Sequence, residues 1–374
     1  MTHVYIHAIE TKVPSHPYAQ ELVKDRILST LNGHDDLKPM IERLYSHTGI
    51  DNRYFALPGL VEKRKSFYFT EDSQWRASPG SGERNNMYIR EASPLFVETA
   101  RKAIAGSKTF SESDITHVIT VSCTGFFAPG PDFKIMTELG LPPHIRRYHL
   151  GFMGCYAAMP AMRMAMDFCK ADPDAVVLIV CTELCSLHFQ PDRNDLDAIV
   201  ATAIFADGAA GVIVSAKEPV RPSFELIRFD THLCKNSGQD MTWDITDKGF
   251  DIKLSRYVPK IIEMDIQTVI GSILQQEDLS LDDIGLWALH PGGKAIVDRI
   301  ERQLALSPDN LGTSRKILRD FGNMSSATVL FVLKDMLDGI NGHHEPSLVC
   351  SMAFGPGVTM EAGLLKTHSP ASLS

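Results

Sequence analysis

The chain contains the same order of buried strand, long loop, buried helix and buried strand twice. Four short apolar runs, bounded by turn residues or charges, are typical of strands that are covered on both faces. They occupy residues 118–121, 176–181, 286–289 and 348–352. Any fold proposed for this chain has to accommodate that repetition.

Two helical segments lie between these strands. The Ala- and Met-rich stretch 155–170 is apolar almost all round, which predicts a buried helix. Pro160 is best tolerated in a first turn, so the regular helix is expected to begin a few residues after Cys155. The stretch 325–338 carries an apolar stripe, with Ser325 or Ser326 as the expected cap and Gly339 as the stop.

Matching points in the two copies are almost equally spaced. Cys123 precedes Cys155 by 32 residues (123 to 155), and His290 precedes Asn323 by 33 (290 to 323). The next strand ends 27 residues after Cys155 (155 to 182) and 28 after Asn323 (323 to 351). Coincidence of spacing is the alternative explanation. We predict a duplicated α/β fold whose halves are 1–216 and 217–374, joined by the Pro-containing segment 217–223, with equivalent elements converging at one central site.

Length and charge narrow the possible partners. The 374 residues are enough for two such halves, and 37 basic against 46 acidic residues give a net charge of −9. That balance argues against nucleic acid or an anionic membrane surface as the main partner. The first fifteen residues show no signal-peptide pattern, and no apolar run approaches the roughly 18 residues of a membrane span. We therefore expect a cytoplasmic protein.

The cysteines indicate reduced thiols. There are seven, with no CxxC pair. Cys181 and Cys185 are four apart and His343 is next to His344, but neither pair has partners at zinc-ligand spacing. The sequence predicts no metal site.

Three residues at matching ends of the repeated elements could carry chemistry. Cys155 follows Gly154 at a strand-to-helix turn, where the positive end of a helix would lower the pKa of its thiol. His290 ends a buried strand before Pro-Gly-Gly, and Asn323 stands just before a helix. Taken alone, each residue has an ordinary structural explanation: a buried cysteine, a histidine in the core and an asparagine that caps a helix. Together they suit a nucleophile, its ion-pair partner and an oxyanion donor.

The motifs around these residues resemble one known family. They are Gly-Cys155, His290-Pro-Gly-Gly, Gly-Asn323-Met-Ser-Ser-Ala, Phe205-Ala-Asp-Gly-Ala-Ala and Ala353-Phe-Gly-Pro-Gly357. They are similar to those of the type III polyketide synthases, the chalcone and stilbene synthase group of the thiolase-like superfamily. The resemblance covers essentially the whole chain. It implies a homodimer of five-layered αβαβα subunits that needs neither metal nor redox cofactor, with malonyl-CoA and acyl-CoA as substrates.

The same resemblance implies a mechanism. Cys155, as a thiolate paired with an imidazolium at His290, would hold the acyl starter. His290 and Asn323 would donate hydrogen bonds to malonyl-CoA and stabilise the enolate that forms on loss of carbon dioxide. Repeated condensation would give a linear polyketide that cyclises.

Substrate contacts are also implied by the resemblance. Phe205 matches a gatekeeper phenylalanine, and the second gatekeeper position falls on Ile252, where an aliphatic side chain would leave a wider passage. Other expected cavity positions are Cys123, His188, Trp243, Phe354 and Gly355, with core packing as the alternative for Trp243 and Ile252. Basic residues expected near a CoA tunnel are Arg43, Arg53 and Lys294, which leaves open whether the starter arrives on CoA or on an acyl carrier protein.

We therefore interpret the chain as a bacterial-type acyltransferase that extends a fatty acyl starter to an alkylpyrone or alkylresorcinol. Alternatives are an initiating 3-ketoacyl synthase that performs one condensation, a Cys-His-Asn thioester hydrolase, and a dimeric acyl-binding protein. The catalytic residues alone do not separate these readings.

Overall fold

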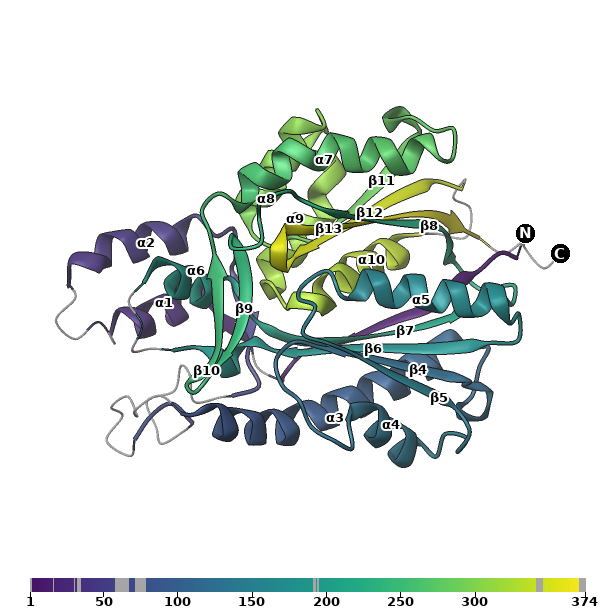
Figure 1. Ribbon diagram of the computed structural model, residues 1–374, viewed down its shortest axis with the longest axis horizontal. Helices are drawn as coiled ribbons and strands as arrows, with labels where there is room; N and C mark the ends of the chain where they lie inside the picture. Colours follow the sequence, from purple (N-terminus) through teal and green to yellow (C-terminus); the bar gives the residue numbers. More distant parts are fainter. Residues whose placement is uncertain are drawn as a thin grey trace.

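A nine-stranded mixed sheet connects the two halves of the chain in the order β11-β12-β13-β8-β1-β7-β6-β4-β5 (Figure 1). The structure is a computed structural model that describes residues 2–15, 17–29, 31, 35–57, 67–70, 79–190, 193, 195–340 and 346–369. The strands from the first half are β1 (Tyr5–Lys12), β4 (His117–Ser122), β5 (Arg146–Gly151), β6 (Val176–Leu184) and β7 (Asp207–Ser215). Those from the second half are β8 (Ser223–Leu233), β11 (Ile284–Leu289), β12 (Leu348–Gly355) and β13 (Thr359–His368).

The elements form five layers (Figure 1). Helices α3 (Ser81–Ser107) and α4 (Pro131–Leu139) cover the outer face of the first-half strands. Helices α5 (Ala158–Ala171) and α10 (Thr328–Gly339) lie between the two groups of strands, and α7 (Val258–Gln275) and α8 (Lys294–Gln303) cover the second group. The predicted thiolase-like αβαβα fold is confirmed.

Smaller elements surround one end of these layers. They are β2 (Pro17–Ala19), α1 (Gln20–Leu28), α2 (Lys38–Ser46), β3 (Asn52–Tyr54), α6 (Leu196–Ile204), β9 (Met241–Thr246), β10 (Gly249–Leu254) and α9 (Gly312–Phe321). Short 3-10 helices occur at Asp35–Leu37, Glu112–Asp114, Cys185–His188, Leu281–Asp283, Pro308–Leu311, Ser325–Ala327 and Pro356–Val358. Strands β9 and β10 form a hairpin beside the edge of the layers.

All four predicted strands are present, as β4, β6, β11 and β12. Every residue of β4 and β6 is buried, as expected for strands with helices on both faces. Helix α5 begins at Ala158, which places Pro160 in its first turn.

The predicted serine cap of α10 is wrong. Ser325 and Ser326 form a 3-10 turn, and α10 begins at Thr328 without a side-chain cap from either serine. Instead Met324 donates its backbone N–H to the Thr328 hydroxyl at 2.8 Å. The side chains of both serines are thereby left for other contacts.

The repeated unit corresponds to β4, α5 and β6 in the first half and to β11, α10 and β12 in the second. Residues 216–222 connect β7 to β8 without a helix or strand. The division of the chain into 1–216 and 217–374 stays a prediction. Among the described residues, no helix combines the length and apolar composition that spanning a bilayer requires.

Candidate active site

Cys155, His290 and Asn323 line one cavity, whose wall is mostly apolar side chains. They come from the turn before α5, the end of β11 and the segment before α10. The sequence places them at matching ends of the two copies, and the structure brings them together. Further predicted residues that line this cavity are Cys123, Phe205, Trp243, Ile252 and Phe354.

The turn that carries Cys155 is held from both halves of the chain. Gly154 has a φ of +88° and donates its backbone N–H to the Cys123 sulfur at 2.9 Å. A Cβ atom on Gly154 would lie 2.2 Å from Cδ of Pro356, and one on Gly355 would lie 2.4 Å from the Tyr156 ring. Glycine is therefore required at both positions, because the rings of Pro356 and Tyr156 occupy the space that a Cβ atom would need.

Burial raises the pKa of the Cys155 thiol to about 11, although hydrogen bonds from Ser325 and Asn323 oppose the shift. The expected lowering of this pKa is wrong. The helical turns of α5 begin three residues after the thiol, and the helix-end field falls off within a turn, so loss of water dominates.

His290 is held by its backbone N–H, which donates to the carbonyl of Met352 at 2.7 Å. Its side chain is buried, and within the described part of the chain neither ring nitrogen has a hydrogen-bond partner. Burial lowers the pKa of the imidazole to about 3. Burial thus shifts both groups toward their neutral forms, which is the opposite direction from the expected thiolate–imidazolium pair.

The amide of Asn323 is oriented by its own chain. Its Oδ1 accepts the backbone N–H of Ser325 at 2.8 Å, and its Nδ2 donates to the carbonyl of Gly292 at 3.1 Å. Since the oxygen is engaged by the 3-10 turn, the amide N–H groups face the turn that follows His290. The second amide N–H serves the hydrogen bond to the Cys155 thiol, so a ligand in the cavity would have to share this donor with the sulfur.

Asn323 is also joined by its backbone to the predicted gatekeeper. Ala206 donates to the carbonyl of Asn323 at 2.8 Å, and Asn323 donates to the carbonyl of Ile204 at 2.9 Å. These two bonds fix Phe205 beside Asn323 across the boundary between the halves.

Arg53 supports this bridge and is not a surface cation. It is fully buried and donates to the carbonyls of Thr202 and Phe205, at 2.5 and 2.9 Å. The expectation that it attracts CoA is wrong, because its guanidinium lies beneath the cavity wall. Arg43 is exposed on α2.

A second cavity adjoins the first. The two cavities share Cys185, Phe205, Trp243 and Ile252. Trp243 and Ile252 are cross-strand partners on β9 and β10, and Trp243 donates its indole N–H to the carbonyl of Cys123 at 2.7 Å. Both side chains therefore form cavity wall as well as packing against their neighbours.

His188 lines the second cavity but is fully engaged. Its Nε2 lies 2.8 Å from the carbonyl oxygen of Thr124, and its Nδ1 accepts the backbone N–H of Phe250 at 3.1 Å. The ring stacks on that of Phe250 with centroids 4.2 Å apart, and burial lowers its pKa to about 3. His188 is thus a neutral wall residue.

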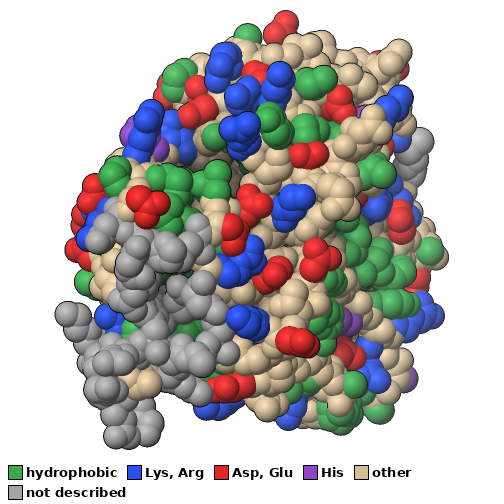
Figure 2. Space-filling model, turned by 60° about the vertical axis from the view of Figure 1, so that its left-hand side comes forward, with side chains coloured by type: hydrophobic (Ala, Val, Ile, Leu, Met, Phe, Trp, Pro, Cys, Tyr) green, Lys and Arg blue, Asp and Glu red, His purple; other side chains and the backbone are tan. Residues whose placement is uncertain are grey.

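Lys294 and Gly355 do not line the cavity of Cys155. Gly355 acts through its close approach to Tyr156. Lys294 lies at a separate hollow that also contains Arg315, Lys316 and Arg319. Each of these four cations is paired with a nearby carboxylate. Figure 2 shows the same mixing of basic and acidic side chains over one face of the molecule.

Glu183 is a buried polar residue of the site that the sequence analysis missed. Its carboxyl accepts hydrogen bonds from the backbone N–H of Cys123, from the Thr124 hydroxyl and from Ser326, at 2.9, 3.0 and 2.5 Å. Burial raises its pKa to about 7. A charged residue inside the otherwise uncharged run Val176–Leu184 was the available signal.

The five-layered fold, with the cysteine, histidine and asparagine at the junction of its halves, is that of a thiolase-like acyltransferase. Two family models match the chain: "Chalcone and stilbene synthases, N-terminal domain" over residues 2–219 and the C-terminal domain of the same description over residues 227–369. The chain therefore belongs to the chalcone and stilbene synthase family of type III polyketide synthases.

Individual relatives agree with this assignment. The chain is 32% identical over 366 residues to "Alpha-pyrone synthesis polyketide synthase-like Pks18" of Mycobacterium tuberculosis, which covers 96% of this chain and 90% of the relative. The crystal structure of PKS-I from the brown alga Ectocarpus siliculosus matches with a TM-score of 0.90 at 29% identity, over 98% of each chain. Tetrahydroxynaphthalene synthase from Streptomyces coelicolor matches with a TM-score of 0.86 at 27% identity, over 98% of this chain and 100% of that one.

The raised pKa of Cys155 predicts slow alkylation at neutral pH. Because the thiolate is the reacting form, the rate of iodoacetamide labelling should rise about tenfold per pH unit between pH 7 and 9, with no plateau below the pKa of about 11. Mass spectrometry of the Cys155 peptide measures this rate, and Cys155→Ala identifies the peptide. A plateau below pH 8 would show a resting thiolate.

Proposed function

We propose that the protein extends a fatty acyl starter with malonyl-CoA and releases an alkylpyrone or alkylresorcinol. The observation that carries this proposal is the wall between the two cavities, where Ile252 faces both spaces together with Phe205. An aliphatic side chain occupies less of the passage than an aromatic ring would. The printed name of the Mycobacterium tuberculosis relative, which refers to α-pyrone synthesis, supports a pyrone product.

Transfer of the acyl starter to Cys155 begins with a neutral Cys155 thiol and a neutral His290 imidazole. Cys155 transfers its proton to His290 as its sulfur attacks the thioester carbonyl of the starter. The bond from the carbonyl carbon to the CoA sulfur breaks, and His290 returns the proton to the departing CoA thiolate. A neutral imidazole with unpaired nitrogens suits this exchange, because it can accept and then donate the same proton.

In the extension step, the malonyl carboxylate leaves as carbon dioxide and its electron pair forms an enolate. Asn323 Nδ2 and a protonated nitrogen of His290 donate to the enolate oxygen. The enolate carbon attacks the Cys155 acyl carbonyl, and the bond between that carbon and the Cys155 sulfur breaks. The Cys155 thiolate takes up one proton from solvent through His290, and the extended chain leaves as a CoA thioester. Its return to Cys155 starts the next cycle.

We assign acyl-CoA as the starter donor, with acyl carrier protein as the alternative, and the reaction requires no metal or redox cofactor. The paired state of Lys294 and its neighbours means that an incoming phosphate competes with Asp298 and other carboxylates. The resulting attraction for a phosphate at this hollow is weaker than that of free cations.

We also propose that the protein is a homodimer. Strand β5 is the edge of the nine-stranded sheet, and most of its residues are exposed. A sheet edge presents unpaired backbone groups, so pairing of β5 with a second copy would satisfy them.

The first prediction separates the roles of Cys155 and Asn323. Cys155→Ala should abolish condensation but retain some malonyl-CoA decarboxylation, because His290 and Asn323 remain. Asn323→Ala should lower both rates by roughly 10² to 10³, as for other single oxyanion donors. Carbon dioxide release measures the first step in each variant. Equal loss of decarboxylation in the two variants would contradict this division of roles.

The second prediction concerns the passage. Ile252→Phe should shift preference toward shorter starters, because the added ring occupies space that a long alkyl chain requires. Competition between acyl-CoA starters of different length measures the shift. Ile245→Phe is the matched control, since this side chain is exposed on the same hairpin. If a folded Ile252→Phe variant keeps the same preference for starter length, Ile252 does not border the passage that the starter occupies.

The third prediction separates iterative extension from a single condensation. Purified protein with one fatty acyl-CoA and malonyl-CoA, without carrier protein or reductant, should release products that contain at least two malonate-derived units and one ring. Mass spectrometry with labelled malonyl-CoA counts the units. A singly extended 3-oxoacyl product at every starter length would instead identify a ketoacyl synthase, and free starter acid alone would identify a hydrolase.

A further inference from the structure

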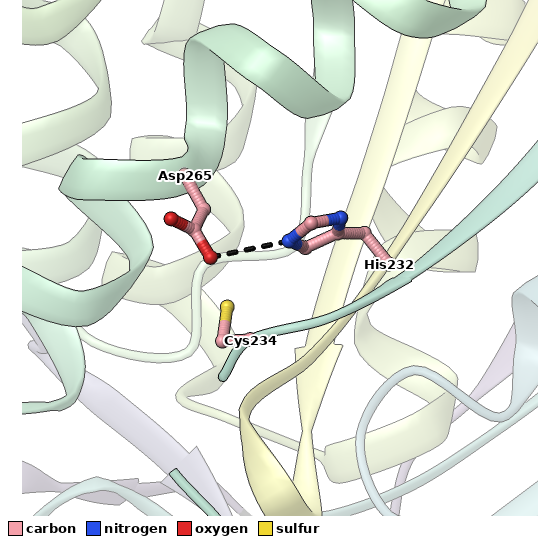
Figure 3. Close-up of side chains that lie close together, drawn as sticks. All are labelled: His232, Cys234 and Asp265. Carbon is pink, nitrogen blue, oxygen red and sulfur yellow. Dashed lines mark hydrogen bonds and ion pairs between the residues drawn. The ribbon is translucent and has the colours of Figure 1, made fainter. Parts of the chain in front are cut away.

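Three metal-ligating side chains converge at a position outside both cavities (Figure 3). His232 lies near the end of β8, Cys234 follows that strand, and Asp265 lies on α7, which packs against β8. One donor atom of each residue lies within 4.8 Å of the others. The Nε2 of His232 is 3.1 Å from Oδ2 of Asp265.

The donor set has the chemistry of a zinc site. Imidazole nitrogen, thiolate sulfur and carboxylate oxygen are the three ligand types that zinc takes in proteins. With bonds of about 2.0 to 2.3 Å in a tetrahedron, ligand atoms lie about 3.3 to 3.7 Å apart. The His232–Asp265 separation of 3.1 Å is close to this spacing. Since no two donor atoms are more than 4.8 Å apart, a displacement of about 1 Å brings all three within bonding range of one ion.

The site is accessible to an ion from solvent, and it leaves a fourth ligand position for water. The side chains of His232 and Asp265 are 34% and 32% exposed, so an ion can enter from solvent and keep one water. Cys234 itself is buried. A site with one buried and two half-exposed ligands is open on a single side.

We propose that His232, Cys234 and Asp265 bind one divalent transition-metal ion, with zinc as the best match. The Cys234 thiol releases its proton to solvent as its bond to the metal forms. This proposal departs from the sequence analysis, which predicted no metal site. It is independent of the polyketide synthase reaction, because none of the three residues lines the cavity of Cys155.

Hydrogen bonds connect the proposed metal site to the loop that forms part of the wall of the Cys155 cavity. Cys234 donates its backbone N–H to the carbonyl of Val358 at 3.3 Å. Ser237 donates its hydroxyl to the carbonyls of Cys234 and Gly357, at 2.7 Å each. Since Pro356 lines the cavity, an ion at Cys234 would stabilise the turn that holds this loop.

Metal binding by the untagged full-length protein tests the proposal. After chelator treatment, titration with Zn²⁺ against a chromophoric competitor should show one equivalent bound, and Co²⁺ should give thiolate-to-cobalt absorption. Cys234→Ser should remove that absorption. Cys234→Ser, Asp265→Asn and His232→Gln should each weaken Zn²⁺ binding at least about 100-fold. Zn²⁺ should also raise the melting temperature of the wild type but not of Asp265→Asn.

Two control variants locate the ion. Cys155→Ala removes the thiol of the active cavity, and His144→Gln removes an exposed histidine elsewhere; both should bind Zn²⁺ like the wild type. Binding lost in Cys155→Ala would place the ion in the catalytic cavity and overturn the proposal. Absence of stoichiometric binding, or binding unchanged in Asp265→Asn and Cys234→Ser, would show that the three residues form only a hydrogen-bonded cluster.

Discussion

The pair of backbone hydrogen bonds between Asn323 and the segment Ile204–Ala206 is the constraint on which the active site depends. It joins a residue of the second half directly to the end of α6 in the first half. Phe205 is thereby fixed as cavity wall, and the amide of Asn323 is fixed as a donor. Arg53 adds a buried guanidinium that donates to the same backbone from below. A small shift between the halves would therefore change the passage and the oxyanion donors together.

Burial determines the electrostatics of the site. Cys155 and His290 both have pKa values moved toward their neutral forms, to about 11 and about 3. A neutral thiol is a poor nucleophile, so Cys155 is expected to be unreactive until a thioester binds. In the proposed extension step, the same low polarity would strengthen the hydrogen bonds that His290 and Asn323 donate to the enolate.

Much of the fold follows from the sequence, because apolar runs with turn boundaries locate β4, β6, β11 and β12, and their spacing reveals the duplication. The same spacing predicts that Cys155, His290 and Asn323 converge, and the structure places them in one cavity. Burial and pKa values cannot be predicted from the sequence in this way, because they depend on the three-dimensional surroundings of each residue. The sequence shows Arg53 as a charge but not its burial, and it shows Cys155 near a helix but not the loss of water around its sulfur. The His232, Cys234 and Asp265 cluster was missed because its third member is supplied by a helix packed against the strand, which no ligand spacing along the chain records.

The close approach of Gly154 and Pro356 has a consequence for how the protein is made. The proline follows Cys155 by 201 residues (155 to 356), and its ring occupies the space above the glycine. The nucleophile turn therefore lacks its covering contact until the ribosome has released the second half. A nascent chain therefore carries Cys155 long before the turn around this residue can reach its native packing.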